Sequence, residues 1–222
     1  MTPAEFKNAH GKVWLNIASS TYPLEDFANL DNHIAMRVLD YPFLLPLVPR
    51  RSRGLVEQYR EARLKASMLR HDCRKPLPLP DSSVDHVLCS HFLEHVFPDE
   101  AAAILKDFHR VLKPGATVHI IVPDIAAQIA GYQLARKTDP KAADEFVRQS
   151  LLSKGNRGSV LYRLLELQGG FGLQHRWMYD QASMEAKVKE AGFILMDAND
   201  TPSAEWRKDD ESVHVVAQRS AV

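Results

Sequence analysis

Residues 84–122 constrain the fold of this chain more than any other segment. A short β-type run at 85–89 is followed by a helix pattern at 98–113 and by a second β-type run at 117–122. Apolar residues recur at helical spacing in the middle part, and a Lys-Pro-Gly sequence closes it. A strand, a helix and a strand in this order form a βαβ unit with two parallel strands. We therefore expect an α/β fold.

Polar side chains crowd the carboxyl end of the first of these strands. Ser90, His91, Glu94 and His95 all fall within six residues of that end. Ligands of open α/β sheets bind in the crevice beyond the carboxyl ends of the strands. Titratable side chains gathered there indicate a functional site rather than packing.

The composition is that of a globular protein without a strong electrostatic preference. Hydrophobic residues make up 45% of the 222 positions, and 28 basic residues balance 28 acidic ones. Because no basic field would attract nucleic acid, we expect no nucleic-acid partner. The only two cysteines, Cys73 and Cys89, cannot form a four-cysteine zinc site and indicate a reducing compartment. No secretory signal or bilayer-spanning apolar run is visible, so we expect a cytoplasmic location.

Three earlier β-type runs, at 12–17, 27–31 and 66–71, extend the expected sheet. The first two are so close that a crossover helix barely fits between them, so either the connection is abbreviated or one strand assignment is wrong. Asp31 ends the second run and Asp72 follows the third. A carboxylate at the end of the second parallel strand is where α/β folds hold a ribose hydroxyl, and Asp72 could accept from an adenine amino group. The alternative is that these acids only cap helices or add solubility.

The loop after the first strand reads Asn16-Ile17-Ala18-Ser19-Ser20 and has no glycine. Nucleotide-binding folds usually place glycines there, so that backbone N–H groups can approach the ligand. Alanine and serine are small, but their Cβ atoms narrow the approach and penalise positive φ. This loop is the main argument against a tightly bound nucleotide.

Residues 34–64 predict an inserted cap. The segment is partly helical, with a better helix at 55–64, but three prolines interrupt its apolar run at 41–49. Arginines follow that run, and an apolar stretch with basic residues behind it can lie on a membrane surface. Peripheral membrane contact through 41–53 is therefore one hypothesis. A local cap packed against the domain is the alternative that we favour, because no sustained amphipathic face is evident.

A second, helical cap is expected over about 125–172, because residues 125–168 are mostly helical and longer than a crossover needs. A Gly-Asn-Arg-Gly sequence at 155–158 should break it. The last two strands are expected at 193–197 and 212–218 as an antiparallel pair, after a helix that Asp180 caps and Gly192 ends.

A glycine-rich stretch precedes His175, Arg176, Trp177 and Tyr179. A flexible hinge beside aromatic, histidine and arginine side chains fits a substrate lid or an acceptor wall. Equally, Trp177 and Tyr179 could be core residues and His175 a surface residue. Asp124, which follows the strand at 117–122, is a further candidate for contact with the substrate.

The string His91-Phe92-Leu93-Glu94-His95 matches the inverted zinc-protease motif His-x-x-Glu-His. On a helix the two histidines could share a zinc ion. The string follows a strand directly, however, whereas the protease motif needs a long helix and a distant third ligand. We therefore expect no metal here, and an ordinary helix start with hydrogen-bonded histidines is the simpler interpretation.

Three stretches together resemble the class I S-adenosylmethionine-dependent methyltransferases, in the broad bacterial group called type 11-like. They are residues 72–96, which carry Leu-Glu-His after the strand, residues 108–124, which carry Arg-Val-Leu-Lys-Pro-Gly, and residues 175–193. The resemblance implies a single domain over residues 1–222. Its fold would be a Rossmann-like three-layer sandwich, with a seven-stranded, mostly parallel sheet, an antiparallel last strand and a helical insertion.

The resemblance also implies roles for individual residues around S-adenosylmethionine. Asp31 would hold the ribose, and Asp72 with Cys73 the adenine. Ser90 and His91 would flank the methyl-transfer side. The loop under the methionine part would comprise Asn16, Ala18, Ser19 and Ser20. The family normally carries glycine at Ala18 and Ser20 and an acid at Asn16, so this chain departs from the pattern in its cofactor loop.

The leading hypothesis is methyl transfer to a small-molecule or glycan-type acceptor. Relatives of this layout suggest the saccharide, and with it a role in polysaccharide biosynthesis. The candidate bases are His91, His95 and His175, with Glu94 orienting one of them, and the candidate acceptor contacts are Arg176, Tyr179 and Asp124. A non-catalytic binding or scaffold protein with an impaired cofactor loop is the alternative, and a zinc enzyme is the third.

Overall fold

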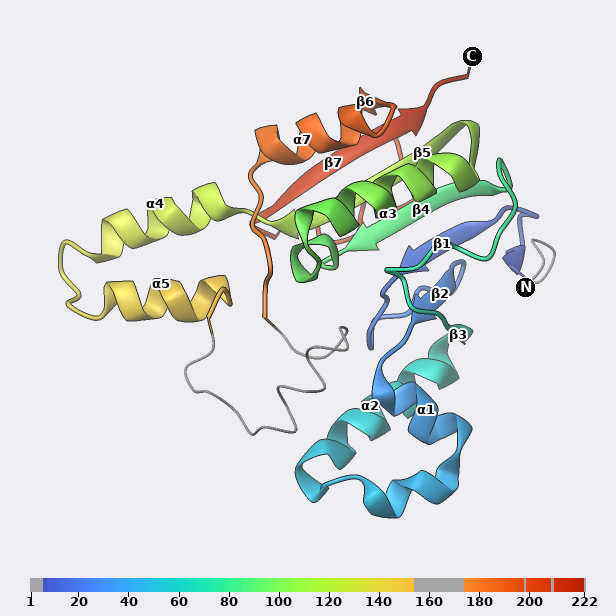
Figure 1. The fold of residues 1–222 in the computed structure, drawn as a ribbon, viewed down its shortest axis with the longest axis horizontal. Helices are drawn as coiled ribbons and strands as arrows, with labels where there is room; N and C mark the ends of the chain where they lie inside the picture. Colours follow the sequence, from blue (N-terminus) through green and yellow to red (C-terminus); the bar gives the residue numbers. More distant parts are fainter. Residues whose placement is uncertain (1–5, 154–173, 198, 209, 222) are drawn as a thin grey trace.

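The computed structural model describes residues 6–153, 174–197, 199–208 and 210–221. Within these residues, seven strands form one sheet in the order β3-β2-β1-β4-β5-β7-β6 (Figure 1). β7 runs antiparallel to β5 and β6, and the other pairs are parallel, which confirms the predicted sheet. The strands are β1 Trp14–Ile17, β2 Ala28–Asp31, β3 Met68–Arg70, β4 Val84–Ser90, β5 Leu112–Pro123, β6 Phe193–Met196 and β7 Ser212–Arg219.

Helices connect and flank these strands. The α-helices are α1 Ile34–Asp40, α2 Arg53–Lys65, α3 Pro98–Val111, α4 Ile125–Ala135, α5 Ala142–Ser150 and α7 Gln181–Glu190. The short 3₁₀ helices are η2 Pro42–Leu47, η3 Arg50–Ser52 and η4 Leu93–His95.

β1 and β2 pair in parallel although no helix lies between them. Leu15 lies opposite Ala28, and Ile17 lies opposite Leu30. The side chain of Asn29 closes the short connection, because its Oδ1 accepts from the backbone N–H of Leu24 at 2.8 Å and its Nδ2 donates to the Leu24 carbonyl at 2.9 Å. The connection is therefore abbreviated, and both strand predictions are confirmed.

α3 and α7 cover one face of the sheet (Figure 1). On α3 the apolar positions Ile104, Leu105 and Phe108 are all buried, and they pack in one core with Val87 and Cys89 of β4. Burying a side chain of this size contributes roughly 1.5 to 3 kcal/mol. The helix pattern read from the sequence therefore locates the side of the sheet where the main core forms.

The opposite face of β4, β5 and β7 is covered by the loop between β6 and β7. Trp206 of this loop packs against a small apolar cluster of Phe27, Leu88 and Ile121. Ser203 is also buried there, 4% exposed. No packing role for this loop was foreseen from the sequence.

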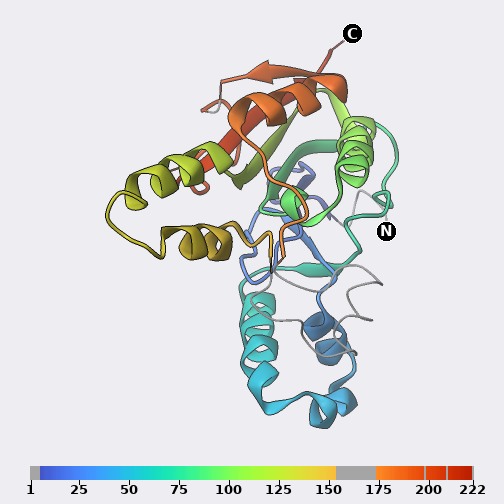
Figure 2. The same ribbon diagram turned by 60° about the vertical axis from the view of Figure 1, so that its left-hand side comes forward.

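Two helical pairs project from the sheet at separate places (Figures 1 and 2). In the first pair, Met36 and Val38 of α1 pack against Val56 and Tyr59 of α2. The three prolines of 41–49 leave a 3₁₀ helix, η2, in place of a regular helix, as expected. The assignment of 34–64 as a cap is a prediction about the domain's organisation and stays one.

The second pair, α4 and α5, lies in the segment expected to be mostly helical over 125–168, and α4 is its first helix. The helix ends at Ala135, and a second one begins at Ala142 after a turn. α5 ends at Ser150, because the next residue, Leu151, has a left-handed φ of 53° and stops the helix. The break expected at 155–158 lies outside the described residues.

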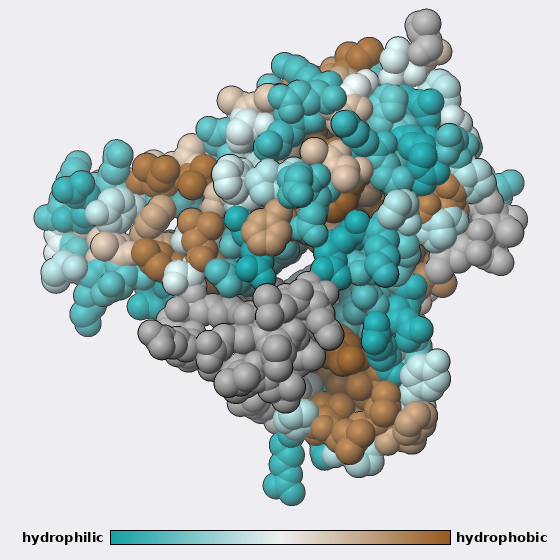
Figure 3. All heavy atoms as spheres, viewed as in Figure 1, coloured by the Kyte–Doolittle hydropathy of each residue, from teal (hydrophilic) through white to brown (hydrophobic). Residues whose placement is uncertain are grey.

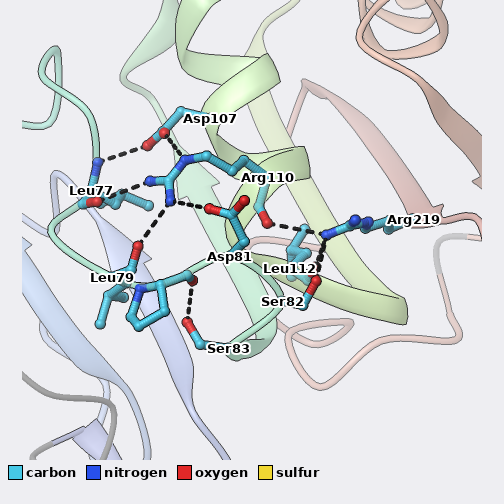
Figure 4. Close-up of polar contacts among 10 residues, drawn as sticks. Leu77, Leu79, Asp81, Ser82, Ser83, Asp107, Arg110, Leu112 and Arg219 are labelled. Atoms are coloured by element: carbon cyan, nitrogen blue, oxygen red, sulfur yellow. Dashed lines mark hydrogen bonds and ion pairs between the residues drawn. The ribbon is translucent and has the colours of Figure 1, made fainter.

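Arg110 of α3 fixes the proline-rich loop that leads into β4 (Figure 4). Its guanidinium donates to the carboxylates of Asp107 and Asp81, each at 2.8 Å. It also donates to the backbone carbonyls of Leu77 and Leu79, at 3.0 and 2.9 Å. Prolines remove the N–H groups that a sheet would need, and one arginine supplies donors to this loop instead.

None of the described helices is long and apolar enough to cross a membrane.

Candidate active site

The loop after β1 turns on two residues with left-handed backbone conformations. Ala18 has a φ of 52° and Ser20 a φ of 50°. These are the two positions at which the resemblance places glycine. A residue with a Cβ pays on the order of 1 kcal/mol or more for such a conformation. The loop therefore has a glycine-type backbone shape without glycine.

Backbone bonds to β2 hold this loop in place. The N–H of Ser19 donates to the carbonyl of Leu30 at 2.9 Å, and the N–H of Ser20 donates to Oδ2 of Asp31 at 2.9 Å. Both acceptors are at the carboxyl end of β2. These bonds offset part of the conformational cost of the turn.

Asp31 joins the loop to the first helical pair. Its Oδ1 accepts from the N–H of His33 at 2.6 Å and from the hydroxyl of Tyr59 at 3.2 Å. The rings of His33 and Tyr59 stack with centroids 5.0 Å apart. Burial, together with the Asp31 charge, raises the pKa of Tyr59, so its hydroxyl remains a donor. Oδ2 accepts one bond among the described residues, which leaves a lone pair for a further donor.

Asn16 and Ser19 are both buried, at 3% and 5% exposed. The Asn16 amide donates to Oδ1 of Asn29 at 2.9 Å and to the carbonyl of Tyr22 at 3.2 Å, so it braces the turn toward β2. The hydroxyl of Ser19 has no hydrogen-bond partner among the described residues. A buried hydroxyl without a partner is costly, and this one is available to a ligand in the loop.

Asp72 and Cys73, the expected adenine contacts, follow β3. Arg74 grips the Asp72 carboxylate with two nitrogens, Nε at 2.9 Å and an Nη at 2.7 Å. The hydrogen bond and charge of Arg74 lower the pKa of Asp72. Burial raises the pKa of the Cys73 thiol to about 12, so it remains protonated at neutral pH. The pairing with Arg74 was not foreseen from the sequence.

The chain leaves β4 through a tight turn rather than a helix. Ser90 is the last residue of β4, and His91 has a left-handed φ of 53°. The N–H of His91 donates to the carbonyl of Ile121 at 2.8 Å, and η4 follows as a single 3₁₀ turn. His91 and His95 therefore do not share a helix face. The helical zinc-protease interpretation of this string is wrong, and so is the ordinary helix start offered as its alternative.

Glu94 lies at the centre of the site and is fully buried, 0% exposed. Nδ1 of His91 lies 3.2 Å from its Oε1, close enough for an ion pair. Neither carboxylate oxygen has a well-aligned hydrogen bond from the described residues. A buried carboxylate is expensive unless a cation or several donors compensate it. Glu94 therefore has unused acceptor capacity at the centre of the site.

The segment after residue 173 brings a distant histidine to Glu94. The carbonyl of Glu94 accepts from the backbone N–H groups of Arg176 at 2.6 Å and Trp177 at 3.2 Å. The rings of His175 and His95 consequently meet edge to face, 5.0 Å apart. Burial lowers the pKa of His175, and the Glu94 charge only partly opposes this effect. Glu94, His95 and His175 form one cluster, which sequence spacing did not indicate.

Of the structural alternative for residues 175–179, only the core position of Tyr179 is confirmed, and the substrate lid or acceptor wall stays a prediction. His175 and Tyr179 are buried, whereas Trp177 is 46% exposed. Burial, with the charge of Glu94 second, raises the pKa of Tyr179 to about 12. Its hydroxyl has no hydrogen-bond partner among the described residues.

The other expected acceptor contacts have structural partners. Oδ1 of Asp124 accepts from the N–H of Ala126 at 2.8 Å and so caps α4. The guanidinium of Arg176 lies over the ring of Phe97, 5.4 Å from its centre. Asp124 also forms a β-bridge with Tyr179, which places it near the His175 segment.

A chain of polar side chains that the sequence did not reveal leads from the sheet to His91. His86 and His119 both contact the hydroxyl of Ser203, at 2.9 and 2.8 Å. Nε2 of His119 lies 3.1 Å from Nδ1 of His214. His214 lies 3.4 Å from Asp210, whose other oxygen is 4.0 Å from His91. The only signal was that three strands each carry a histidine in an apolar run.

Residues 51–120 match the family model described as a methyltransferase domain. Among curated protein sequences, none matches the chain.

Solved structures match over nearly the whole chain. One is a chain from the Haloferax volcanii complex between the Trm112 methyltransferase activator and a methyltransferase, at 14% identity and a TM-score of 0.52, covering 95% of this chain and 82% of that one. A SAM-dependent methyltransferase from Methanosarcina mazei matches at 15% identity and a TM-score of 0.51, covering 94% and 92%. Magnesium protoporphyrin IX methyltransferase from Synechocystis, with SAH bound, matches at 11% identity and a TM-score of 0.51, covering 94% of this chain and 74% of that one.

At these identities the likeness concerns the fold. The chain has the fold of S-adenosylmethionine-dependent methyltransferases, and residues 51–120 match the family model of their methyltransferase domain.

Proposed function

We propose that this protein binds S-adenosylmethionine and transfers its methyl group to a hydroxyl of a small-molecule or glycan-type acceptor. The observation that carries the proposal is the left-handed backbone at Ala18 and Ser20. A loop without glycine adopts, at a conformational cost, the turn in which backbone amides can approach a ligand.

The residues present fit the cofactor at this loop. The Ser19 hydroxyl is buried and unpartnered within the described residues, and Oδ2 of Asp31 has room for one more donor such as a ribose hydroxyl. Asn16 supports the turn by donating to Asn29. Asp72 and Cys73 follow β3, which pairs with β2, and are the candidate contacts to the adenine. The side chains at Ala18 and Ser20 narrow the approach, so we expect weaker binding than with a glycine loop.

S-adenosylmethionine supplies an already activated methyl group, so the protein's task is mainly to align the acceptor and to remove its proton. His91 and Ser90 lie at the end of β4, on the strand next to β1. Glu94 lies beside His91 and can stabilise the imidazolium that forms when His91 accepts a proton. His95 and His175 are the further candidate bases, and Arg176, Tyr179 and Asp124 the candidate contacts to the acceptor.

Methyl-labelled S-adenosylmethionine tests the acceptor class. The protein should transfer label to a saccharide or another small hydroxyl compound from a panel, and Glu94→Gln should slow transfer by about a hundredfold or more while cofactor binding persists. Labelling of protein or nucleic acid with none of the small compounds labelled would contradict the proposed acceptor.

A non-catalytic role is the second candidate, because the strained loop gives it a specific basis. In that case the native chain would not bind the cofactor, and glycine at positions 18 and 20 would create binding. Detectable binding by the native chain removes this candidate.

Contact with a membrane surface is a further element of the proposal. Phe43 and Leu47 of η2 are 74% and 79% exposed, and Tyr41 is 49% exposed. Figure 3 shows the apolar patch over the first helical pair. Arg50 and Arg53 follow it in sequence, so the patch combines apolar side chains with basic residues that anionic lipid would attract.

A further inference from the structure

Three side chains from two distant segments converge beside the end of β4. Glu94, His95 and His175 each offer one ligand atom, and these atoms lie within 4.8 Å of one another. The backbone bond from Arg176 to the Glu94 carbonyl, 2.6 Å long, holds the two segments together. From the sequence we expected no metal here because a distant third ligand was missing, and His175 is such a residue.

Two of the three residues, Glu94 and His175, are buried and carry polar atoms without a hydrogen-bond partner among the described residues. Glu94 is 0% and His175 7% exposed. Both oxygens of Glu94 and Nδ1 of His175 have no hydrogen-bond partner in the described part of the chain. Desolvating such groups without partners costs several kcal/mol for a charge and roughly 1 to 3 kcal/mol for a neutral donor or acceptor. A bound cation would satisfy them together.

The remaining contacts match the surroundings of a metal site. Nδ1 of His95 lies 3.3 Å from the carbonyl of Gln174, so it can donate there and leave Nε2 free to coordinate. Histidine ligands usually donate their second nitrogen to a carbonyl or carboxylate in this way. His91 lies 3.2 Å from Oε1 of Glu94, which leaves Oε2 as the free oxygen.

We propose that Glu94, His95 and His175 bind a divalent first-row transition-metal ion, with Zn²⁺ as the cation that best suits two imidazoles and one carboxylate. Three protein ligands leave an open coordination position for water or for an oxygen of a substrate. If the proposed function holds, the substrate oxygen at this position is the hydroxyl of the methyl acceptor, and the ion would lower the pKa of that hydroxyl. This part of the inference rests on the proposed function. Metal binding itself does not depend on the methyl transfer.

The test is a calorimetric titration of the metal-free full chain with Zn²⁺ at neutral pH. We expect one saturable site. Glu94→Gln and His175→Gln should each weaken it by about tenfold or more, since each replaces a good ligand by a weakly coordinating amide. His10→Gln, at an exposed histidine away from the cluster, should leave it unchanged.

A second measurement covers the case in which a variant folds poorly. Co²⁺ added to the native chain should give the visible absorption of a four- or five-coordinate site, and Zn²⁺ should displace it. The proposal is overturned if the native chain shows no saturable site, or if both folded variants bind Zn²⁺ as tightly as the native chain. Titration of the same metal-free protein with S-adenosylhomocysteine is independent of these outcomes, so failure of the metal site and failure of the proposed cofactor are distinguished.

Discussion

The backbone N–H of Ser20 donates to Oδ2 of Asp31 at 2.9 Å, and so the end of β2 holds the loop after β1 in a left-handed turn. The turn has the shape that glycine usually provides. The bond explains how a loop of alanine and serine can keep it. It also makes the loop after β1 and the carboxylate of Asp31, both of which we propose to contact the cofactor, one structural unit.

Glycine at either turn position should stabilise the fold. Ala18→Gly and Ser20→Gly each remove a Cβ from a left-handed residue, so we expect a gain of about 0.5 to 1 kcal/mol in the free energy of unfolding. We also expect tighter binding of S-adenosylhomocysteine. Urea denaturation and calorimetry measure the two effects.

Ser82→Gly is the matched control for these variants, because Ser82 has a φ of 54° but lies in the loop before β4. It should leave ligand affinity unchanged. If glycine at Ala18 and Ser20 destabilises the protein, the loop is not strained in the way described.

Asp31→Asn should disrupt the turn. Asp31 now accepts hydrogen bonds from three donors, and in the variant an amide nitrogen would face one of them. We therefore expect the free energy of unfolding to fall by about 1 to 3 kcal/mol and cofactor binding to weaken. Tyr59→Phe removes only the 3.2 Å hydroxyl bond and should cost about 1 kcal/mol with affinity retained. Equal loss of affinity in both variants would mean that Asp31 acts only through general stability.

Acid should destabilise the fold through two buried histidines. Burial lowers the pKa of His86 to about 3 and that of His119 to about 4, from 6.5. As the pH falls below 6.5, the unfolded chain takes up these protons first. The contribution of the two neutral histidines to the free energy of unfolding is therefore complete above pH 6.5. It is lost progressively as the pH falls toward their two folded-state pKa values.

Urea midpoints at about pH 7 and about pH 5 measure this loss. The carboxylates of Asp72 and Asp210, whose pKa values are lowered below 3.8, begin to matter only at lower pH. His119→Asn should flatten the dependence in this window. An unchanged midpoint in the native protein would contradict the burial of these rings.

Serine at the two most exposed residues of η2 should weaken membrane contact. Phe43→Ser and Leu47→Ser each remove a side chain that insertion would bury, worth roughly 1.5 kcal/mol or more, so binding to anionic vesicles should fall about tenfold for each. Co-sedimentation measures it. Leu134→Ser on α4, where the leucine is 69% exposed, is the control and should have no effect. Native protein that stays in the supernatant would remove the membrane hypothesis.

The sheet could be predicted because its information is local. The spacing of Ile104, Leu105 and Phe108 identifies α3, and the short apolar runs before and after it identify the strands on either side. The close spacing of β1 and β2 left open whether the connection is abbreviated or one strand assignment is wrong. The structure shows an abbreviated connection, which the side chain of Asn29 closes.

The sequence predicted which polar residues follow each strand, but not which of these groups come together in one site. Ser90, His91 and Glu94 follow one strand, but the approach of His175 depends on backbone bonds to the Glu94 carbonyl from a segment far downstream. No periodicity encodes such a contact. For the same reason Ser203, which joins two strand histidines from a polar loop, carried no signal.

The most direct test of the account is calorimetric titration of the native chain with S-adenosylmethionine and S-adenosylhomocysteine. We predict saturable one-site binding of both ligands, weakened by Asp31→Asn and tightened by Ser20→Gly. Folded native protein that binds neither ligand at millimolar concentration would contradict it.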